Sequence, residues 1–92
     1  MGLYIISWKD RPDSLALRMA TREAHLAYGA GRIKLGGPYL DEAGTMVGSM
    51  LIIEAESLDD ARAFHANDPY VKAGLVGESD VSAWRVTLGA IA

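Results

Sequence analysis

The sequence predicts one domain of the α+β class, built from two consecutive strand–helix–strand units over residues 1–92. A chain of 92 residues has room for a single hydrophobic core. Half of its residues are apolar and 23% are charged, which is typical of a folded globular protein. Segments with the alternating pattern of a strand and segments with helical spacing follow each other in the same order in both halves.

The first unit lies in the N-terminal half of the chain. Residues 3–8 are rich in β-branched and aromatic side chains and predict a strand. A helix is predicted from Asp13 or Ser14, both common N-cap residues, to about Ala30. Residues 32–40 predict a second strand, whose Gly-Gly-Pro run indicates a bulge or an edge position. The helical spacing is carried by Leu15, Met19, Arg22 and Leu26.

A turn at residues 41–44 leads into the second unit. Residues 45–55 are the most apolar segment of the chain and predict a strand with two apolar faces. Ser57, with the acidic Asp60 following in the first helical turn, matches a capping box, so a second helix is predicted to about Ala66. A short helical turn, a loop and the last strand are then predicted at residues 69–73, 74–78 and 81–88.

Two units of this kind fold as a four-stranded antiparallel sheet with both helices on one face, the ferredoxin-like arrangement. In the first, third and last strands, however, both alternating sets of side chains are largely apolar. A sheet with one solvated face should instead alternate apolar and polar residues. We therefore expect a homodimer in which a second subunit covers the helix-free face, so that the two sheets form an α+β barrel around a pocket.

Charge and the N-terminal segment narrow the range of partners. The formal net charge is −3, and the nine Lys and Arg residues are scattered along the chain. This pattern argues against a nucleic-acid partner and favours a small-molecule ligand. The N-terminal segment matches neither a signal peptide nor a membrane span. We therefore expect a cytoplasmic protein without a membrane partner.

The residue inventory also argues against a cofactor. The chain contains no cysteine, which excludes a thiolate nucleophile and a zinc site built on sulfur. Its two histidines, His25 and His65, lack the spacing of a helical metal site. The glycines do not form the G-x-G-x-x-G pattern of a nucleotide-binding loop. We therefore expect neither a metal nor an organic cofactor, and a metal enzyme is the least favoured class.

Several short groups of residues, spread over nearly the whole chain, match one known family. They are Arg22-Glu23-Ala24-His25-Leu26-Ala27-Tyr28, Gly37-Pro38, Gly48-Ser49, Asn67-Asp68-Pro69-Tyr70, Ala73-Gly74-Leu75 and Trp84. The combination of an R-x-x-H-L-x-Y helix with a later D-P-Y is fairly specific, although each group is short. On these residues the chain resembles the YCII family.

The resemblance implies a dimeric ferredoxin-like α+β barrel that acts on a small molecule. The family is associated with a histidine and an aspartate as a catalytic pair, and one branch eliminates hydrogen chloride from a chlorinated hydroxyquinol. Matched onto this chain, the catalytic pair is His25 and Asp68. The resemblance thus implies cofactor-independent acid/base chemistry of the lyase or isomerase type, similar to a dehydrochlorinase, on an unidentified substrate.

Each member of the pair also has a purely structural interpretation. A histidine on a helix with apolar neighbours is often a core residue, and an aspartate before a proline is a good N-cap. His25 is suited to acid/base chemistry, because an imidazole with an ordinary pKa of about 6.5 populates both protonation states near neutrality. For Asp68 the two roles are compatible, since one oxygen can accept a helix amide while the other accepts an imidazole N–H.

Five further residues are candidates for substrate binding. Arg22 lies one turn before His25, where it either binds a substrate oxyanion or extends into solvent. A glycine on the second strand either admits a ligand close to the backbone or permits a bulge. The aromatic candidates either line a pocket or belong to the core. The five candidates are Arg22, Tyr28, Gly37, Ser49 and Tyr70.

Two function classes remain open at this point. The first is a small-molecule enzyme, and the alternative is a non-catalytic ligand-binding or structural dimer. His65 matches none of the family's motifs, so we expect it on the surface of the second helix without a role. Trp84, near the C-terminal end, is expected either in the pocket or in the core.

Overall fold

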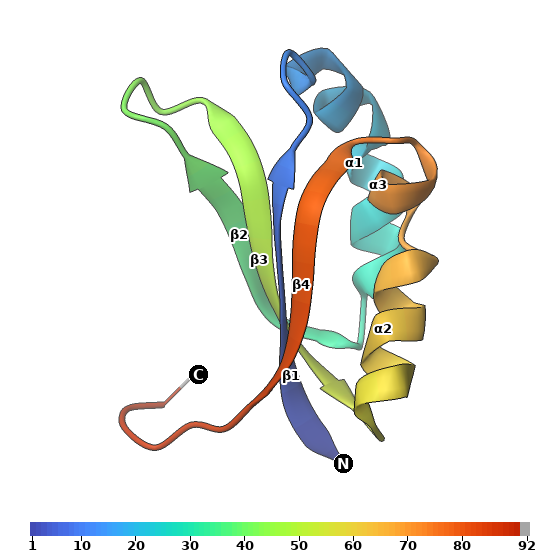
Figure 1. The fold of residues 1–92 in the computed structure, drawn as a ribbon, viewed down its shortest axis with the longest axis vertical. Coiled ribbons are helices and arrows are strands. Elements are labelled where there is room, and N and C mark those ends of the chain that lie inside the picture. Colours follow the sequence, from blue (N-terminus) through green and yellow to red (C-terminus); the bar gives the residue numbers. More distant parts are fainter. Residues whose placement is uncertain (91–92) are drawn as a thin grey trace.

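The structure, a computed structural model, describes residues 1–90. The elements follow the predicted order, with one short helix after the second long one (Figure 1). They are β1 (Gly2–Asp10), α1 (Leu15–Gly29), β2 (Ile33–Leu40), β3 (Met46–Ala55), α2 (Leu58–Ala66), α3 (Pro69–Lys72) and β4 (Val76–Trp84).

The four strands form one antiparallel sheet in the order β2-β3-β1-β4. All three helices lie on the same face of this sheet, which confirms the predicted ferredoxin-like arrangement (Figure 1). Pro38 lies in β2, which is an edge strand. Proline is tolerated in an edge strand because the outer side of the strand has no neighbour that needs its N–H. The register irregularities of β2 occur between Ile33 and Leu35 and between Tyr39 and Leu40, on either side of the Gly-Gly-Pro run.

The boundaries predicted for the last strand were wrong. It was expected at residues 81–88 after a loop at 74–78, whereas β4 begins at Val76 and ends at Trp84. The extent of β1, the strand with which β4 pairs, sets these boundaries. Val76 pairs with Asp10 at the end of β1, and Trp84 pairs with Leu3 near its start, so residues 85–90 make no strand pairing with β1.

The core lies between the sheet and the helices. Leu51 of β3 and Phe64 of α2 are among its members, and Tyr70 of α3 closes it from the side of the short helix. The cluster of buried side chains consists of Ile6, Trp8, Leu51, Ile53, Ala55, Ala61, Phe64, Tyr70 and Leu75.

The inward face of α1 differs from the expected one. Leu15, Met19 and Leu26 are about half exposed, and the buried residues of this helix are Arg18, His25 and Gly29. A helix whose buried side carries two polar side chains does not pack as ordinary core. This face of α1 belongs to a site instead.

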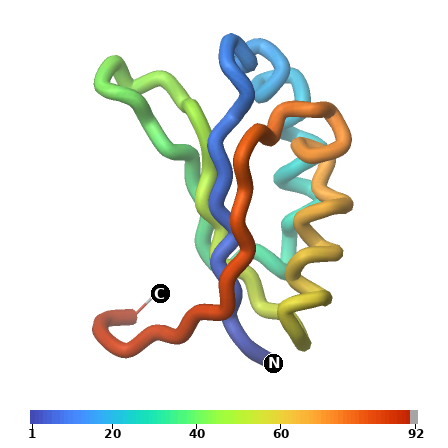
Figure 2. The backbone as a smooth tube through the Cα atoms, in the orientation of Figure 1, coloured from blue at the N-terminus to red at the C-terminus, as the bar shows by residue number. Residues whose placement is uncertain are grey.

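The opposite face of the sheet carries no helix. Cross-strand pairing places Ile5 opposite Ile52 and Leu3 opposite Trp84 on this face. The tube view shows residues 85–90, after β4, curling toward the helix-free side (Figure 2). None of the helices within residues 1–90 is long and apolar enough to cross a membrane.

Candidate active site

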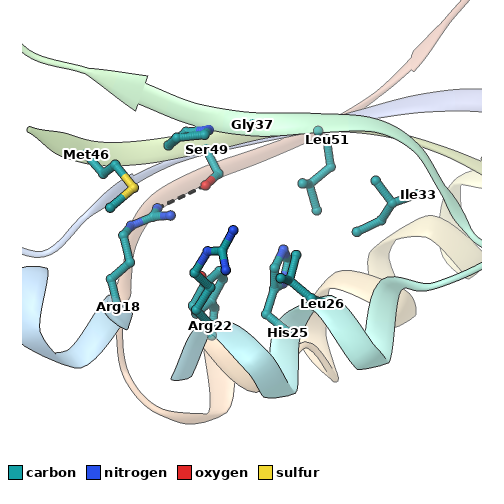
Figure 3. Close-up of a pocket in the computed structure, with 12 residues that line it drawn as sticks. Arg18, Arg22, His25, Leu26, Ile33, Gly37, Met46, Ser49 and Leu51 are labelled. Carbon is teal, nitrogen blue, oxygen red and sulfur yellow. Dashed lines mark hydrogen bonds between the residues drawn. The ribbon is translucent and has the colours of Figure 1, made fainter. Parts of the chain in front are cut away.

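A cavity of about 230 Å³ opens between α1 and the β2–β3 hairpin. The tip of this hairpin leans away from the helices (Figures 1 and 2). In the close-up, Arg18, Arg22 and His25 extend from α1 toward Ser49 and Leu51 on the strand above them (Figure 3). The remaining lining is mostly apolar and comes from Leu26, Ile33, Gly36, Gly37, Pro38, Met46 and Tyr70.

His25 and Asp68, 43 residues apart in the sequence, are in direct contact. The Nδ1 atom of His25 lies 2.8 Å from Oδ2 and 2.9 Å from Oδ1 of Asp68. The contact forms because α1 packs against α3, whose N-cap is the aspartate. An imidazole beside a carboxylate at this distance donates its Nδ1–H to it.

Asp68 is held by the start of α3. Its side chain accepts the backbone N–H of Tyr70 at 2.9 Å, and Pro69 occupies the first helical position. Asp68 is completely buried, and no solvent competes for its oxygens. The N-cap role and the contact with His25 therefore coexist in one carboxylate, in which Oδ1 serves the helix and Oδ2 makes the shorter contact to the imidazole.

The ring of His25 is fixed by aromatic neighbours as well. It stacks on Tyr70 with a centroid distance of 4.2 Å and meets Trp8 edge-on at 6.2 Å. With Nδ1 engaged by Asp68, a neutral imidazole has its proton on Nδ1 and its lone pair on Nε2. Within residues 1–90, Nε2 makes no hydrogen bond, and the ring lines the cavity. This arrangement presents a free imidazole lone pair to a ligand.

Arg18 forms the second polar centre of the cavity. Its Nε donates to Asp10 Oδ2 at 2.7 Å, and its Nη2 lies 2.9 Å from Asp10 Oδ1, from the Gly48 carbonyl and from Ser49 Oγ. Trp8 donates its indole N–H to the same carboxylate at 2.9 Å. Arg18 is only 3% exposed, so this network holds its guanidinium in one orientation.

Comparison with known proteins now identifies the family. The model of the YCII-related domain matches residues 2–85. The chain belongs to the YCII family. Protein YciI of Escherichia coli O6:H1 is 40% identical over 84 residues, which cover 79% of this YCII chain and 86% of the relative. The Emericella nidulans derivative of benzaldehyde biosynthesis cluster protein C is 33% identical over 85 residues, covering 79% and 87% of the two chains.

A solved YCII-like structure is also similar. It is the 5-chloro-2-hydroxyhydroquinone dehydrochlorinase TftG from Burkholderia phenoliruptrix AC1100, in complex with 2,5-dihydroxybenzoquinone. Its sequence is 43% identical, the match covers 90% of this chain and 93% of that chain, and the TM-score is 0.80. The predicted family resemblance is thereby confirmed.

Four of the five residues expected to bind substrate in this YCII protein line the cavity. Arg22, Gly37, Ser49 and Tyr70 do so, together with His25. Tyr28 does not line it, because its hydroxyl donates to the Phe64 carbonyl at 2.7 Å and its ring stacks on Phe64. Trp84 lies at the far end of β4 and lines neither the cavity nor the buried core.

The surface position expected for His65 was wrong. His65 is buried, and its ring stacks on Trp8 at a centroid distance of 5.5 Å. Its Nδ1 is a buried atom without a hydrogen-bond partner in the described part of the chain. Burial lowers the pKa of this imidazole below the usual 6.5, and the nearby Asp68 carboxylate acts in the opposite direction.

Burial raises the pKa of the Tyr70 hydroxyl above its ordinary value near 10. The Asp68 and Asp10 carboxylates act in the same direction. Arg18 and Arg22 oppose the shift. Tyr70 therefore carries its proton at neutral pH and can donate a hydrogen bond into the cavity.

Sequence reasoning missed Arg18 and Asp10. The signal that could have found Arg18 is its spacing, because positions 18, 22 and 25 follow i, i+4 and i+7 and share one helix face. No comparable signal marks Asp10, which follows a strand and looks like a turn residue. Within residues 1–90 there is no group of three or more His, Asp or Glu side chains that could hold a metal.

Proposed function

We propose that this protein is a small-molecule enzyme that works without a cofactor, by acid/base chemistry of the elimination or isomerisation type. His25 is the general base, and Asp68 positions it. The observation that carries the proposal is the 2.8 Å contact between His25 Nδ1 and the buried Asp68 carboxylate, beside a cavity that the ring also lines. A histidine oriented in this way is a recurrent arrangement for proton transfer.

In the proposed step, His25 Nε2 removes a proton from the substrate. The electron pair left behind forms a new double bond, and in an elimination a leaving group such as chloride departs from the neighbouring carbon. The imidazolium that results is stabilised by the Asp68 carboxylate, which accepts the Nδ1–H hydrogen bond. The proton then passes to solvent, or returns to another atom of the substrate in an isomerisation.

The substrate is proposed to be a small hydroxylated ring compound. A volume of about 230 Å³ is below the usual range for drug-sized ligands and suits a single ring. TftG, the 43% identical relative, is a dehydrochlorinase, and its structure holds a dihydroxybenzoquinone. A chlorinated hydroxyquinol is therefore the first compound to test.

We also propose that the working form is a homodimer, as the apolar strand pattern predicted. Ile5 and Met50 contribute apolar surface to the helix-free face and are only partly buried there, and Trp84 on the same face is exposed. Apolar surface on one side of a small sheet is commonly covered by a second subunit.

The direct test is turnover of 5-chloro-2-hydroxyhydroquinone, followed as chloride release. His25→Ala should abolish it. Asp68→Asn should lower kcat by roughly 10²–10⁴-fold, because the amide can still cap α3 but no longer fixes the Nδ1–H tautomer. The ¹⁵N chemical shifts of His25 should report that change of tautomer, which lost stability alone would not produce.

A matched control is Ser57→Ala. It removes the N-cap of α2, which accepts the Asp60 N–H, and costs about 1 kcal/mol of stability away from the cavity. Its kcat should equal that of the wild type. Full activity in both Asp68→Asn and Asp68→Ser would mean that the aspartate is only a helix cap. Full activity in His25→Ala would refute the proposal.

A further inference from the structure

One nitrogen of the Arg18 guanidinium is available to a ligand in the cavity. All its hydrogen bonds are made by Nε and Nη2, so Nη1 has no partner within residues 1–90. The side chain is only 4% exposed, and it lines the cavity. Nη1 is not itself a buried atom, so its two free N–H groups can donate to a ligand in the cavity.

Two neighbouring hydroxyl groups are donors as well. Ser49 Oγ accepts a hydrogen bond from Arg18 Nη2 at 2.9 Å, which leaves the serine O–H free to donate. The Tyr70 ring lies under the guanidinium, with Arg18 Cζ 5.1 Å from its centroid, and its protonated hydroxyl makes no hydrogen bond within the described chain. Both residues line the cavity.

The charged side chains that line the cavity are cationic, whereas Asp10 and Asp68 are not part of the lining. Asp10 neutralises Arg18 from behind, through a contact that faces away from the cavity lining. Arg22, one turn further along α1, lines the same cavity and makes no ion pair within residues 1–90. No aspartate or glutamate is among the lining residues. At this end of the cavity, donors and two lining cations without a lining carboxylate favour an anionic oxygen.

We propose that Arg18, Ser49 and Tyr70 form an oxyanion subsite, with Arg22 as a second cation in the lining, and that the ligand is a single-ring compound bearing an ionised oxygen. This inference rests on the proposed function of the same cavity and specifies its substrate class as phenolates and enolates of small rings. The ionised oxygen binds at Arg18, and the C–H or O–H that loses its proton faces His25.

The spacing of the two centres agrees with this assignment. Arg18 and His25 are seven residues apart on α1, which places their Cα atoms about 10 Å apart along the helix axis. A ligand that touches both must extend along the helix by roughly one ring with its substituents. Negative charge that develops on the ring during proton removal would then be stabilised at the Arg18 end.

The test on the unmodified protein uses two probes of the same size. One is 2,5-dihydroxybenzoquinone, which carries ionised oxygens at neutral pH, and the other is neutral 2,5-diaminobenzoquinone, which presents N–H donors at the same positions. Calorimetric titration should show the anionic probe binding at least 10-fold more tightly. Equal affinity for the two probes would overturn the proposal.

Variants then locate the preference. Ser49→Ala and Tyr70→Phe each remove one donor without a change of charge and should each weaken the anionic probe by about 10-fold, as for hydrogen bonds to charged groups. Arg18→Lys keeps a cation beside the buried Asp10 but loses the free Nη1, and should weaken the probe by at least as much. Arg62→Gln removes an exposed cation outside the cavity and should change nothing.

These outcomes separate the subsite from the catalytic proposal. His25→Ala should keep the preference for the anionic probe, because it leaves all three donors in place. If Arg18→Lys, Ser49→Ala and Tyr70→Phe all bound the anionic probe as tightly as the wild type, the subsite would be refuted even if the enzyme turned substrate over. The wild type could instead prefer the anionic probe while showing no turnover that His25→Ala abolishes. That result would support the subsite and refute the proposed enzyme.

Discussion

Two buried histidines flank one tryptophan, and their environments differ. His25 meets the edge of Trp8 and is paired with Asp68, whereas His65 stacks on the same indole with an unpartnered Nδ1. A buried imidazole without an acceptor for a second proton favours its neutral form. Protonation of His65 is therefore disfavoured while its ring stays buried.

At the residue scale, His65 should make folding sensitive to mild acid. Its pKa is lowered in the folded protein, mainly by burial, so below about pH 6.5 the unfolded chain binds more protons at this position than the native chain. Stability is thus fully present above the unfolded value and is lost as the pH falls through the folded value. Urea unfolding at pH 7.5 and pH 5.0 measures this loss.

The control for this prediction is His65→Phe, which keeps an aromatic ring against Trp8 and cannot be protonated. The stability lost between the two pH values should be smaller in this variant than in the wild type. An identical loss in both proteins would show that His65 does not contribute, and that other groups carry the acid sensitivity.

At the scale of elements, β1 and β3 approach each other closely at Gly48. A Cβ at Gly48 would lie only 2.3 Å from the backbone oxygen of Trp8 and 3.2 Å from the Cα of Lys9. Backbone atoms cannot move aside as a side chain can. The absence of a side chain at position 48 thus allows β3 to pair with β1 beside the Arg18 network.

Gly48→Ala should therefore destabilise the fold by about 1–3 kcal/mol or more, as overpacking does. The free energy of unfolding in urea checks this. The matched control is Gly37→Ala on the edge strand, where an added Cβ meets nothing within 4 Å, so its stability should stay within about 0.5 kcal/mol of the wild type. Equal stability of the two variants would contradict the close approach.

At the scale of the whole molecule, the helix-free face should bring two chains together. Sedimentation at micromolar concentration should give the mass of a dimer. Met50→Lys places a charge on this face and should shift the protein toward monomer, since a buried charge without a partner is costly. Ala63→Lys, on the exposed side of α2, adds the same charge and should remain dimeric. A monomeric wild type would refute the dimer.

The order of elements could be read from the sequence because its causes are local. Alternating apolar residues specify strands, and the cap at Ser57 and the Asp68-Pro69 pair specify where helices begin, since each involves atoms only a few residues apart. The family motifs likewise drew attention to His25 and Asp68 as a pair. Their 2.8 Å separation, however, depends on the packing of α1 against α3.

The sequence by itself thus determined the α+β class, the succession of strands and helices and the family, whereas only the tertiary structure decided which face of α1 turns inward. Apolar spacing favoured Leu15, Met19 and Leu26, yet Arg18 and His25 are the buried residues. Burying polar groups requires partners, and these are Asp10 and Asp68, which belong to distant segments. Helical periodicity cannot show such partners, because they meet α1 only after the chain has folded.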